Sequence, residues 1–215
     1  MTNDTFSSRE EYIRTLFGHE NAAQAQTRAA LTAANDGISI HAEEARILQL
    51  LIRLSGVKKI VEIGTLGGYS ALSMASALPA DGHIWTLEKD AARAAQSRTH
   101  TAHEKRITVI EGDARETLAS LSPLAPFDMI FIDADKLNYA AYLDWAETHV
   151  RKGGMIIGDN TLLFDAVWMA ERPPRVRDTA LKAMRDFNRR LADPEKYLGI
   201  MLPTGEGMTI AQKLF

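Results

Sequence analysis

Short apolar segments alternate with amphipathic segments along most of the chain. The apolar segments have the length and the flanking glycines of buried strands, and in the amphipathic segments apolar residues recur at helical spacing. The predicted strands span residues 60–64, 83–88, 107–112, 127–133 and 154–159, and the predicted helices span 69–78, 90–102, 114–121, 138–150 and 177–192. This alternation predicts a mainly parallel sheet with helices on both faces.

The N-terminal part of the chain has a purely helical pattern. Residues 8–35 are rich in alanine and contain few helix breakers, which predicts one long helix ending near Asp36-Gly37. Residues 42–54 carry apolar side chains at helical spacing, and Ser55-Gly56 should end that second helix.

The C-terminal part has an alternating pattern. Residues 197–203 and 207–214 predict two strands, and 204–206 (Thr-Gly-Glu) predict the turn of a hairpin. The expected fold is therefore an α/β, Rossmann-like domain over residues 1–215, with an antiparallel hairpin at the edge of the sheet. The N-terminal helices, within residues 1–55, are expected to cover the substrate site.

Composition narrows the class of protein. The net charge of −3 and the pI of about 6.1 give no overall basic character for binding nucleic acid in bulk. The absence of cysteine excludes disulfides, zinc–thiolate sites and cysteine nucleophiles. The N-terminal segment is polar, and no apolar run reaches the about 18 residues of a membrane span. A cytoplasmic protein without membrane contact is expected.

A glycine-rich turn follows the first predicted strand. Residues 64–68 (GTLGG) would let a ligand approach the backbone closely, but their spacing does not match the dinucleotide fingerprint G-x-G-x-x-G. Glu88 ends the second strand, where a carboxylate can accept both hydroxyls of a ribose. Asp113 follows the third strand, where it could meet an adenine edge. The alternative is an ordinary tight turn with a surface glutamate.

A carboxylate, Glu62, precedes this turn. It could receive a cationic amine, such as that of the amino-acid half of S-adenosylmethionine, whereas it would repel the pyrophosphate of a dinucleotide. Charge therefore favours an adenosyl amino acid as ligand. The alternative is a local ion pair of Glu62 with Lys58 or Lys59.

Acidic and amide side chains follow the fourth and fifth strands. Asp133, Asp159 and Asn160 are expected to converge above the sheet, and an oxygen-only set of this kind suits Mg²⁺, with Ca²⁺ or Mn²⁺ as alternatives. The alternatives are an Asx turn at 159–160 and a solvated loop at 133–135. Lys136 stands near this set and could lower the pKa of a bound hydroxyl or take its proton, unless it only forms a salt bridge.

These motifs together resemble a known family. The segments VEIGTLGGYSALSMA, TLEKD, IEGDA, FIDADKLNYAAY and GDNTL resemble the cation-dependent class I O-methyltransferases, the group that contains catechol and caffeoyl-CoA O-methyltransferases. The resemblance runs from about residue 37 to the C-terminus and includes the hairpin. It implies a sheet of seven strands and a homodimer.

The resemblance also implies roles for individual residues. S-adenosylmethionine would lie against Ile40, Glu62, Gly64, Ser70, Glu88, Asp113, Ala114, Asp133 and Tyr142. Asp133, Asp159 and Asn160 would bind the divalent cation, so that Asp133 serves both ligands, and Lys136 would be the catalytic base. The expected reaction moves the methyl group of S-adenosylmethionine to a hydroxyl of a catechol-like small molecule.

Three other functions remain open from the sequence. Some relatives of this family act on tRNA nucleoside hydroxyls, although the acidic balance of this chain weighs against that substrate. A nucleotide-dependent oxidoreductase is disfavoured by the broken fingerprint and by Glu62. A catalytically silent protein that binds the adenosyl ligand would have no need of the acids and the lysine.

Two segments have no assigned role. Ile40-His41 stands where relatives often carry Val or Thr followed by Ser, so Ile40 can still pack on the cofactor while His41 either caps a helix or faces the substrate. In the loop 161–176, three apolar side chains could form a wall of the substrate site or serve as core or dimer contacts. They are Phe164, Trp168 and Met169. Three arginines, Arg172, Arg175 and Arg177, could meet an anionic group or simply be solvated.

Overall fold

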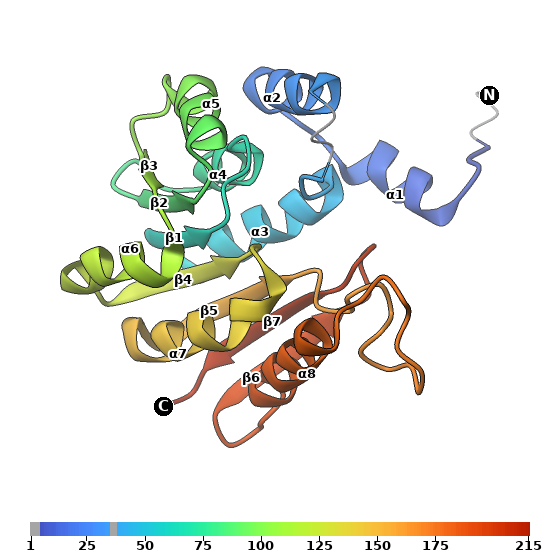
Figure 1. The fold of residues 1–215 in the computed structure, drawn as a ribbon. Coiled ribbons are helices and arrows are strands. Elements are labelled where there is room, and N and C mark those ends of the chain that lie inside the picture. The colour runs from blue at the N-terminus through green and yellow to red at the C-terminus, as the bar shows by residue number, and fades with distance from the viewer. Residues whose placement is uncertain (1–4, 35–37) are drawn as a thin grey trace.

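The computed structural model describes residues 5–34 and 38–215, and a seven-stranded sheet lies at its centre (Figure 1). The strands are β1 (Lys59–Ile63), β2 (His83–Glu88), β3 (Ile107–Glu111), β4 (Phe127–Ile132), β5 (Val150–Asp159), β6 (Tyr197–Leu202) and β7 (Met208–Lys213). Their order is β3-β2-β1-β4-β5-β7-β6. The first five strands are parallel, and β7 runs antiparallel to both β5 and β6. The predicted Rossmann-like sheet with its antiparallel edge is confirmed.

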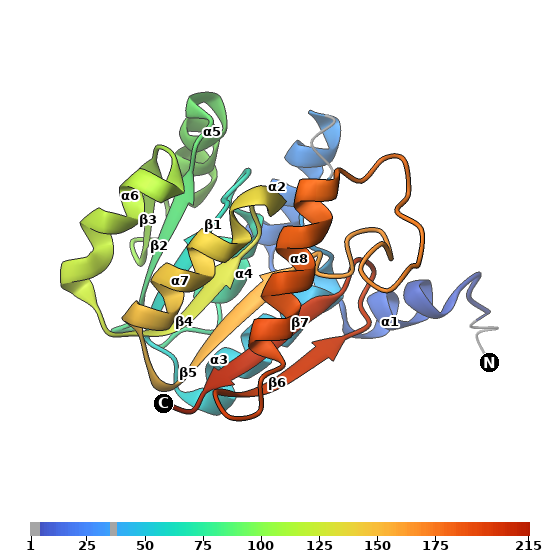
Figure 2. The same ribbon diagram turned by 60° about the horizontal axis from the view of Figure 1, so that its bottom comes forward.

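Helices cover both faces of the sheet. They are α1 (Arg9–Phe17), α2 (Ala22–Ala33), α3 (Ala42–Ser55), α4 (Tyr69–Ala75), α5 (Ala91–Thr101), α6 (Ala114–Leu121), α7 (Tyr139–His149) and α8 (Asp178–Leu191), with 3₁₀ turns at Ser122–Leu124 and Lys136–Asn138. Helices α6, α7 and α8 pack on one face and α3, α4 and α5 on the other (Figure 2). Helix α1 packs on α3, and α2 packs on α4. None of the helices in the described part of the chain is both long and apolar enough to cross a membrane.

The central strand β4 shows how the sequence builds two cores. Its side chains alternate between the two faces, as the period of a strand requires. Met129 and Phe131 enter the cluster under α3 and α4, whereas Ile130 and Ile132 enter the cluster under α6, α7 and α8. Because both faces are covered, all four side chains are fully buried, which explains the continuous apolar run in the sequence.

The prediction of one helix over residues 8–35 is wrong. The chain turns at Gly18 between α1 and α2, and a side chain at that position would press against the carbonyl oxygen of Arg14. Asn21 then starts α2 with a capping box, in which its side chain accepts the backbone N–H of Gln24 and the Gln24 side chain accepts the N–H of Asn21. Propensity alone favoured continuity, but the cap starts a new helix. The predicted stop at Asp36-Gly37 lies outside the described residues.

Two other boundaries differ from the prediction. Strand β5 already begins at Val150, where β4 pairs with it through Phe127, and an irregular register follows before the pairing resumes. The connection between β6 and β7 spans 203–207, longer than the predicted turn. The end of α3 is as predicted, since Gly56 caps it in the left-handed conformation.

Candidate active site

A pocket of about 410 Å³ opens at the carboxyl ends of the parallel strands. This is the edge of the sheet at which open α/β folds bind their ligands, and the volume is in the range of small-molecule sites. Its walls come from the turn after β1, the ends of β2, β3 and β4, and residues that precede α3. Ten of the predicted site residues line it: Ile40, Gly64, Ser70, Glu88, Asp113, Ala114, Asp133, Lys136, Tyr142 and Asn160. Glu62 and Asp159 do not line this pocket.

The glycine turn lets the end of β1 lie directly against the end of β4. Gly64 has a φ of +99°, a conformation that side chains disfavour, and a Cβ at this position would overlap the backbone oxygen of Asp133. The backbone N–H of Asp133 also donates to the carbonyl of Ile63 at 2.9 Å. Only glycine therefore lets the ends of β1 and β4 approach each other this closely.

Glu88 supports the turn as well as lining the pocket. One of its carboxylate oxygens accepts the backbone N–H of Leu66 at 2.8 Å, and the other accepts that of Asp90 at 3.0 Å. These bonds fix the direction of the carboxylate at the end of β2. Its oxygens retain acceptor capacity for the hydroxyls of a ribose.

Asp113 lies at the N-terminus of α6 and has several partners. Its carboxylate accepts the backbone N–H of Arg115 at 2.9 Å and pairs with the Arg115 guanidinium at 2.6 Å. Hydrogen bonds from Arg115 lower the pKa of this carboxyl to about 2. Asp113 is therefore a charged helix cap at the rim of the pocket.

Glu62 lies fully buried beneath the turn. Its carboxylate accepts the hydroxyl of Thr86, which is hydrogen-bonded to Thr65 on the pocket wall. Burial raises the pKa of Glu62 to about 8, and hydrogen bonding by Ser70 and Thr86 opposes the rise. The alternative of an ion pair with the neighbouring lysines is wrong, because Lys58 pairs with Asp81 and Lys59 binds the carbonyl of Leu124.

Lys136 connects the ends of β4 and β5. Its Nζ lies 3.5 Å from Oδ1 of Asp133 and donates to the Tyr139 hydroxyl at 2.7 Å and to the carbonyl of Asp159 at 3.3 Å. The Tyr139 hydroxyl in turn lies 2.8 Å from the Asp159 carbonyl and 3.0 Å from that of Ile132. The salt-bridge alternative thus holds for Asp133, yet Lys136 also lines the pocket.

Asp159 and Asn160 end β5 in an unusual environment. Asp159 is 2% exposed, and its Oδ1 is buried without a hydrogen-bond partner among the described residues. Its Oδ2 accepts the amide of Asn160 at 3.2 Å, and Asn160 has a positive φ of 53°. A buried carboxylate oxygen without a partner is costly, which points to a ligand for it.

The protonation equilibria of this acidic cluster are displaced in opposite directions. Burial raises the pKa of Asp133 and lowers that of Lys136, because each charge is poorly solvated there. Burial, followed by the carboxylates of Asp133 and Glu44, raises the pKa of Asp159 well above its ordinary value. The like charge of Asp133 thus adds to the effect of burial on Asp159, and such displaced groups are typical of functional sites.

His41 stands at the first cap position of α3. Its backbone N–H donates to the carboxylate of Glu44 at 2.8 Å, so the predicted capping position is confirmed. The imidazole is exposed, and a side chain placed on Gly205 would lie 3.9 Å from its Cδ2 atom. The ring therefore lies beside the turn between β6 and β7.

The loop after β5 is fastened to the same turn. The backbone N–H groups of Thr161 and Leu162 donate to Gly207 and Glu206, respectively. Phe164 and Trp168 are 43% and 66% exposed, so they are not core residues. Of the three arginines, Arg172 pairs with Asp178 at 2.7 Å, Arg175 lies over the Phe164 ring at 4.3 Å, and Arg177 is exposed.

Several pocket residues were not predicted from the sequence. Some follow strand ends and could have been found by that position alone: Leu66, Lys89, Gly112, Ala134 and Asp135. Others come from helices or from the segment before α3 and carry no local signal: Leu31, Ile38, Ser39, Tyr69 and Arg93. Tyr139, which orients Lys136, was also missed, although it lies in the same motif as Tyr142.

Comparison with known proteins gives a consistent result. Residues 19–214 match the model of the O-methyltransferase family. A catechol O-methyltransferase from Niastella koreensis is 39% identical over 168 residues, covering 75% of this chain and 76% of the relative. The crystal structure of a putative O-methyltransferase from Klebsiella pneumoniae superposes with a TM-score of 0.85 at 33% identity and covers 96% of each chain.

A ligand-bound structure is also similar. The O-methyltransferase TomG from Streptomyces achromogenes, in complex with S-adenosylmethionine, superposes with a TM-score of 0.85 at 29% identity and covers 100% of both chains. The resemblance inferred from the motifs is thereby confirmed. The chain belongs to the O-methyltransferase family and is an S-adenosylmethionine-dependent O-methyltransferase.

Proposed function

We propose that this protein methylates one hydroxyl of a catechol-like small molecule with the help of a divalent cation. The observation that carries the proposal is the meeting of Asp133, Lys136 and Asp159 at the edge of the cofactor pocket. A methyltransferase that only bound its cofactor would not need a lysine between the half-buried Asp133 and the buried Asp159. The catechol O-methyltransferase among its relatives supports this acceptor class.

The residues after β4 and β5 fit a hard cation. Asp133, Asp159 and Asn160 offer only oxygen ligands, and the partnerless Oδ1 of Asp159 needs a positive neighbour. Residues 5–34 and 38–215 contain no group of three or more His, Cys, Asp and Glu side chains able to hold a metal ion. The proposed site therefore uses two carboxylates and one amide oxygen, leaving positions for water and acceptor oxygens. Mg²⁺ matches this set best, and Ca²⁺ and Mn²⁺ accept the same ligands.

When bound, the cation would hold two adjacent acceptor oxygens and favour the ionised form of the attacking hydroxyl. Lys136 would take the proton of that hydroxyl at Nζ, because burial favours its neutral amine. Tyr139 holds Nζ in place, and Gly64 lets the cofactor turn lie against Asp133. Holding both reactants in line can supply about 7–11 kcal/mol of the barrier.

The acceptor would enter beside His41 and the loop 161–168. Phe164 and Trp168 are exposed there and offer aromatic surface to a planar ring. His41 lies next to the β6–β7 turn, where it would meet the part of the acceptor that points away from the cofactor. Residues 1–55 would cover this side of the site, since Leu31 and Ile40 already line the pocket.

A homodimer is part of the proposal. Leu50 and Leu54 project from the outer face of α3, and Leu198 and Ile200 project from the edge strand β6, all at least 57% exposed. Leu202, two residues after Ile200, packs on the core cluster that includes α3. Because alternate residues of a strand share a face, Leu198 and Ile200 lie on the same face of the sheet as α3. An apolar patch of this kind on an edge strand favours association with a second copy. Light scattering at micromolar concentration should give twice the chain mass.

The decisive experiment is a methyl-transfer assay. Labelled S-adenosylmethionine would be offered with caffeate and 3,4-dihydroxybenzoate, with Mg²⁺ and again with EDTA. We expect transfer to vicinal hydroxyls that EDTA abolishes. Transfer that persists in EDTA would refute the cation site. An absence of transfer to any catechol would refute the acceptor class and direct the search to other acceptors, including tRNA.

A further inference from the structure

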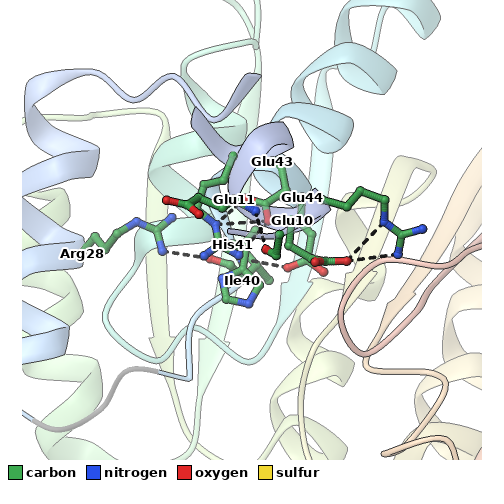
Figure 3. Close-up of polar contacts among 10 residues, drawn as sticks. Glu10, Glu11, Arg28, Ile40, His41, Glu43 and Glu44 are labelled. Atoms are coloured by element: carbon green, nitrogen blue, oxygen red, sulfur yellow. Dashed lines mark hydrogen bonds and ion pairs between the residues drawn. The ribbon is translucent and has the colours of Figure 1, made fainter. Parts of the chain in front are cut away.

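Arg28 of α2 binds three segments that are far apart in the sequence. Its Nε pairs with Oε1 of Glu20 at 2.8 Å, and its Nη1 donates to the carbonyl of Ile40 at 3.4 Å. Its guanidinium also lies 4.0 Å from the ring centre of Tyr69, at the start of α4. Figure 3 shows Arg28 reaching across to Ile40, next to the cap formed by His41 and Glu44. One side chain thus connects α2, the segment before α3 and the first turn of α4.

The connected segments form one wall of the cofactor pocket. Leu31, one turn after Arg28, and Ile40 both line the pocket and are at most 3% exposed. Leu31 also fills the space above Gly67, where any Cβ would overlap its side chain. Because Tyr69 lines the pocket too, Arg28 lies behind three of the side chains that a bound cofactor would touch.

Arg28 is only partly satisfied in this arrangement. The 3.4 Å bond to Ile40 is long for an N–H donor, and Nη2 is buried without a hydrogen-bond partner among the described residues. The bond from Nη1 would improve if residues 38–40 moved slightly towards Arg28. A ligand that packs against Ile40 from the pocket would press these residues towards Arg28, which lies behind them.

We propose that Arg28 is a positioning residue for the binding of S-adenosylmethionine. Through its contacts with Glu20, Ile40 and Tyr69, Arg28 holds α2 and residues 38–40 closed over the cofactor. The inference rests on the assignment of the 410 Å³ pocket to this cofactor. Arg28 does not line the pocket, so it acts through Ile40, Leu31 and Tyr69 and not on the reacting atoms.

The test compares Arg28→Met with Arg98→Met. Methionine keeps the length and the apolar contact with Tyr69 but removes every donor. The control residue Arg98, on α5, forms an exposed ion pair with Glu111 of β3. For Arg28→Met, calorimetry should show a Kd for S-adenosylhomocysteine raised about ten- to thirtyfold, the loss of a charged hydrogen bond. With saturating S-adenosylmethionine, kcat should stay within about threefold of the original. Arg98→Met should change neither value, and Arg28→Lys should restore part of the affinity.

Hydrogen exchange gives a second readout, which does not require the Arg28→Met protein to fold as the original does. In the original protein, S-adenosylhomocysteine should protect the amides of α2 and of residues 38–41. Glu20→Gln, which keeps Arg28 in place but weakens its anchor, should reduce that protection. An unchanged Kd for S-adenosylhomocysteine in Arg28→Met would overturn the proposal. Equal ligand protection of these amides in the original protein and in Glu20→Gln would also overturn it. Failure of the original protein to bind either ligand would instead overturn the cofactor assignment itself.

Discussion

The two halves of the active site are built on opposite principles. On the turn side, formed by Gly64, Glu62 and Glu88, most polar groups hold one another: Glu88 accepts two backbone N–H groups, and Oε2 of Glu62 accepts the hydroxyl of Thr86. Oε1 of Glu62 is buried without a partner among the described residues, but the raised pKa of Glu62 favours its neutral form. On the acid side, formed by Asp133, Lys136, Asp159 and Asn160, a carboxylate oxygen has no partner and like charges lie together.

This difference indicates what each half is for. The turn side is preorganised, so a cofactor would bind to a surface that already has its final shape. The acid side is electrostatically unbalanced, so it gains free energy when a cation or a reacting proton arrives. The predictions below separate the two halves, because a change in one should leave the measured property of the other intact.

Asp159→Asn should have the largest effect. It keeps the volume of the side chain but removes the buried negative charge, so kcat with Mg²⁺ should fall about a thousandfold, a loss of several kcal/mol of transition-state stabilisation. The Kd for S-adenosylmethionine should change less than threefold, because Asp159 does not line the cofactor pocket. In the absence of cation, the variant should be more stable to urea than the original near pH 7, since asparagine removes the free-energy cost that the raised pKa of the buried Asp159 carboxyl represents.

Asp186→Asn is the matched control, because Asp186 is exposed on α8. It should leave kcat unchanged. EDTA-sensitive turnover that survives in Asp159→Asn would place the cation elsewhere.

Replacement of Lys136 should lower kcat about a hundredfold to a thousandfold, the usual contribution of a general base. Lys136→Met and Lys136→Arg together distinguish two roles. Arginine retains a positive charge but cannot give up its proton in this pH range. If Lys136 is the base, both variants should be equally impaired, with cofactor affinity unchanged.

Recovery of activity by Lys136→Arg would mean that the side chain supplies charge instead of accepting a proton. Lys182→Met, on the exposed face of α8, serves as the control. The acid side would then act on the acceptor through its charge and not through proton transfer.

The contrast between the halves also explains what the sequence could predict. Glu88, Asp133 and Asp159 all end strands, and a parallel sheet brings such ends to one edge, so position in the pattern was enough to find them. Arg28 and Leu31 reach the site only through the packing of α2 on α4, which depends on a break near Gly18 that helix propensity did not indicate. Local patterns fix strand ends, whereas the placement of a covering helix is decided by tertiary contacts.

The pH dependence of stability should reveal the turn side as a gradual slope of the free energy of unfolding. Glu62 has a pKa of about 8 when folded, raised by burial and by the carboxylates of Asp133 and Glu88, while hydrogen bonding by Ser70 and Thr86 opposes the rise. Between its ordinary value near 4.5 and about 8, the folded state therefore holds a proton that the unfolded state has lost. The free energy of unfolding should fall as the pH rises through this window, by about 1.4 kcal/mol per pH unit at most.

Glu62→Gln should remove this slope, because glutamine stays neutral throughout. Urea unfolding of both proteins at pH 5, 6, 7 and 8 gives the measurement, and Glu116→Gln, exposed on α6, is the control that should keep the original slope. Identical pH profiles for the original protein and Glu62→Gln would mean that Glu62 is ionised when folded. The turn side would then carry an uncompensated buried charge like the acid side, and the distinction between a preorganised half and an unbalanced half would fail.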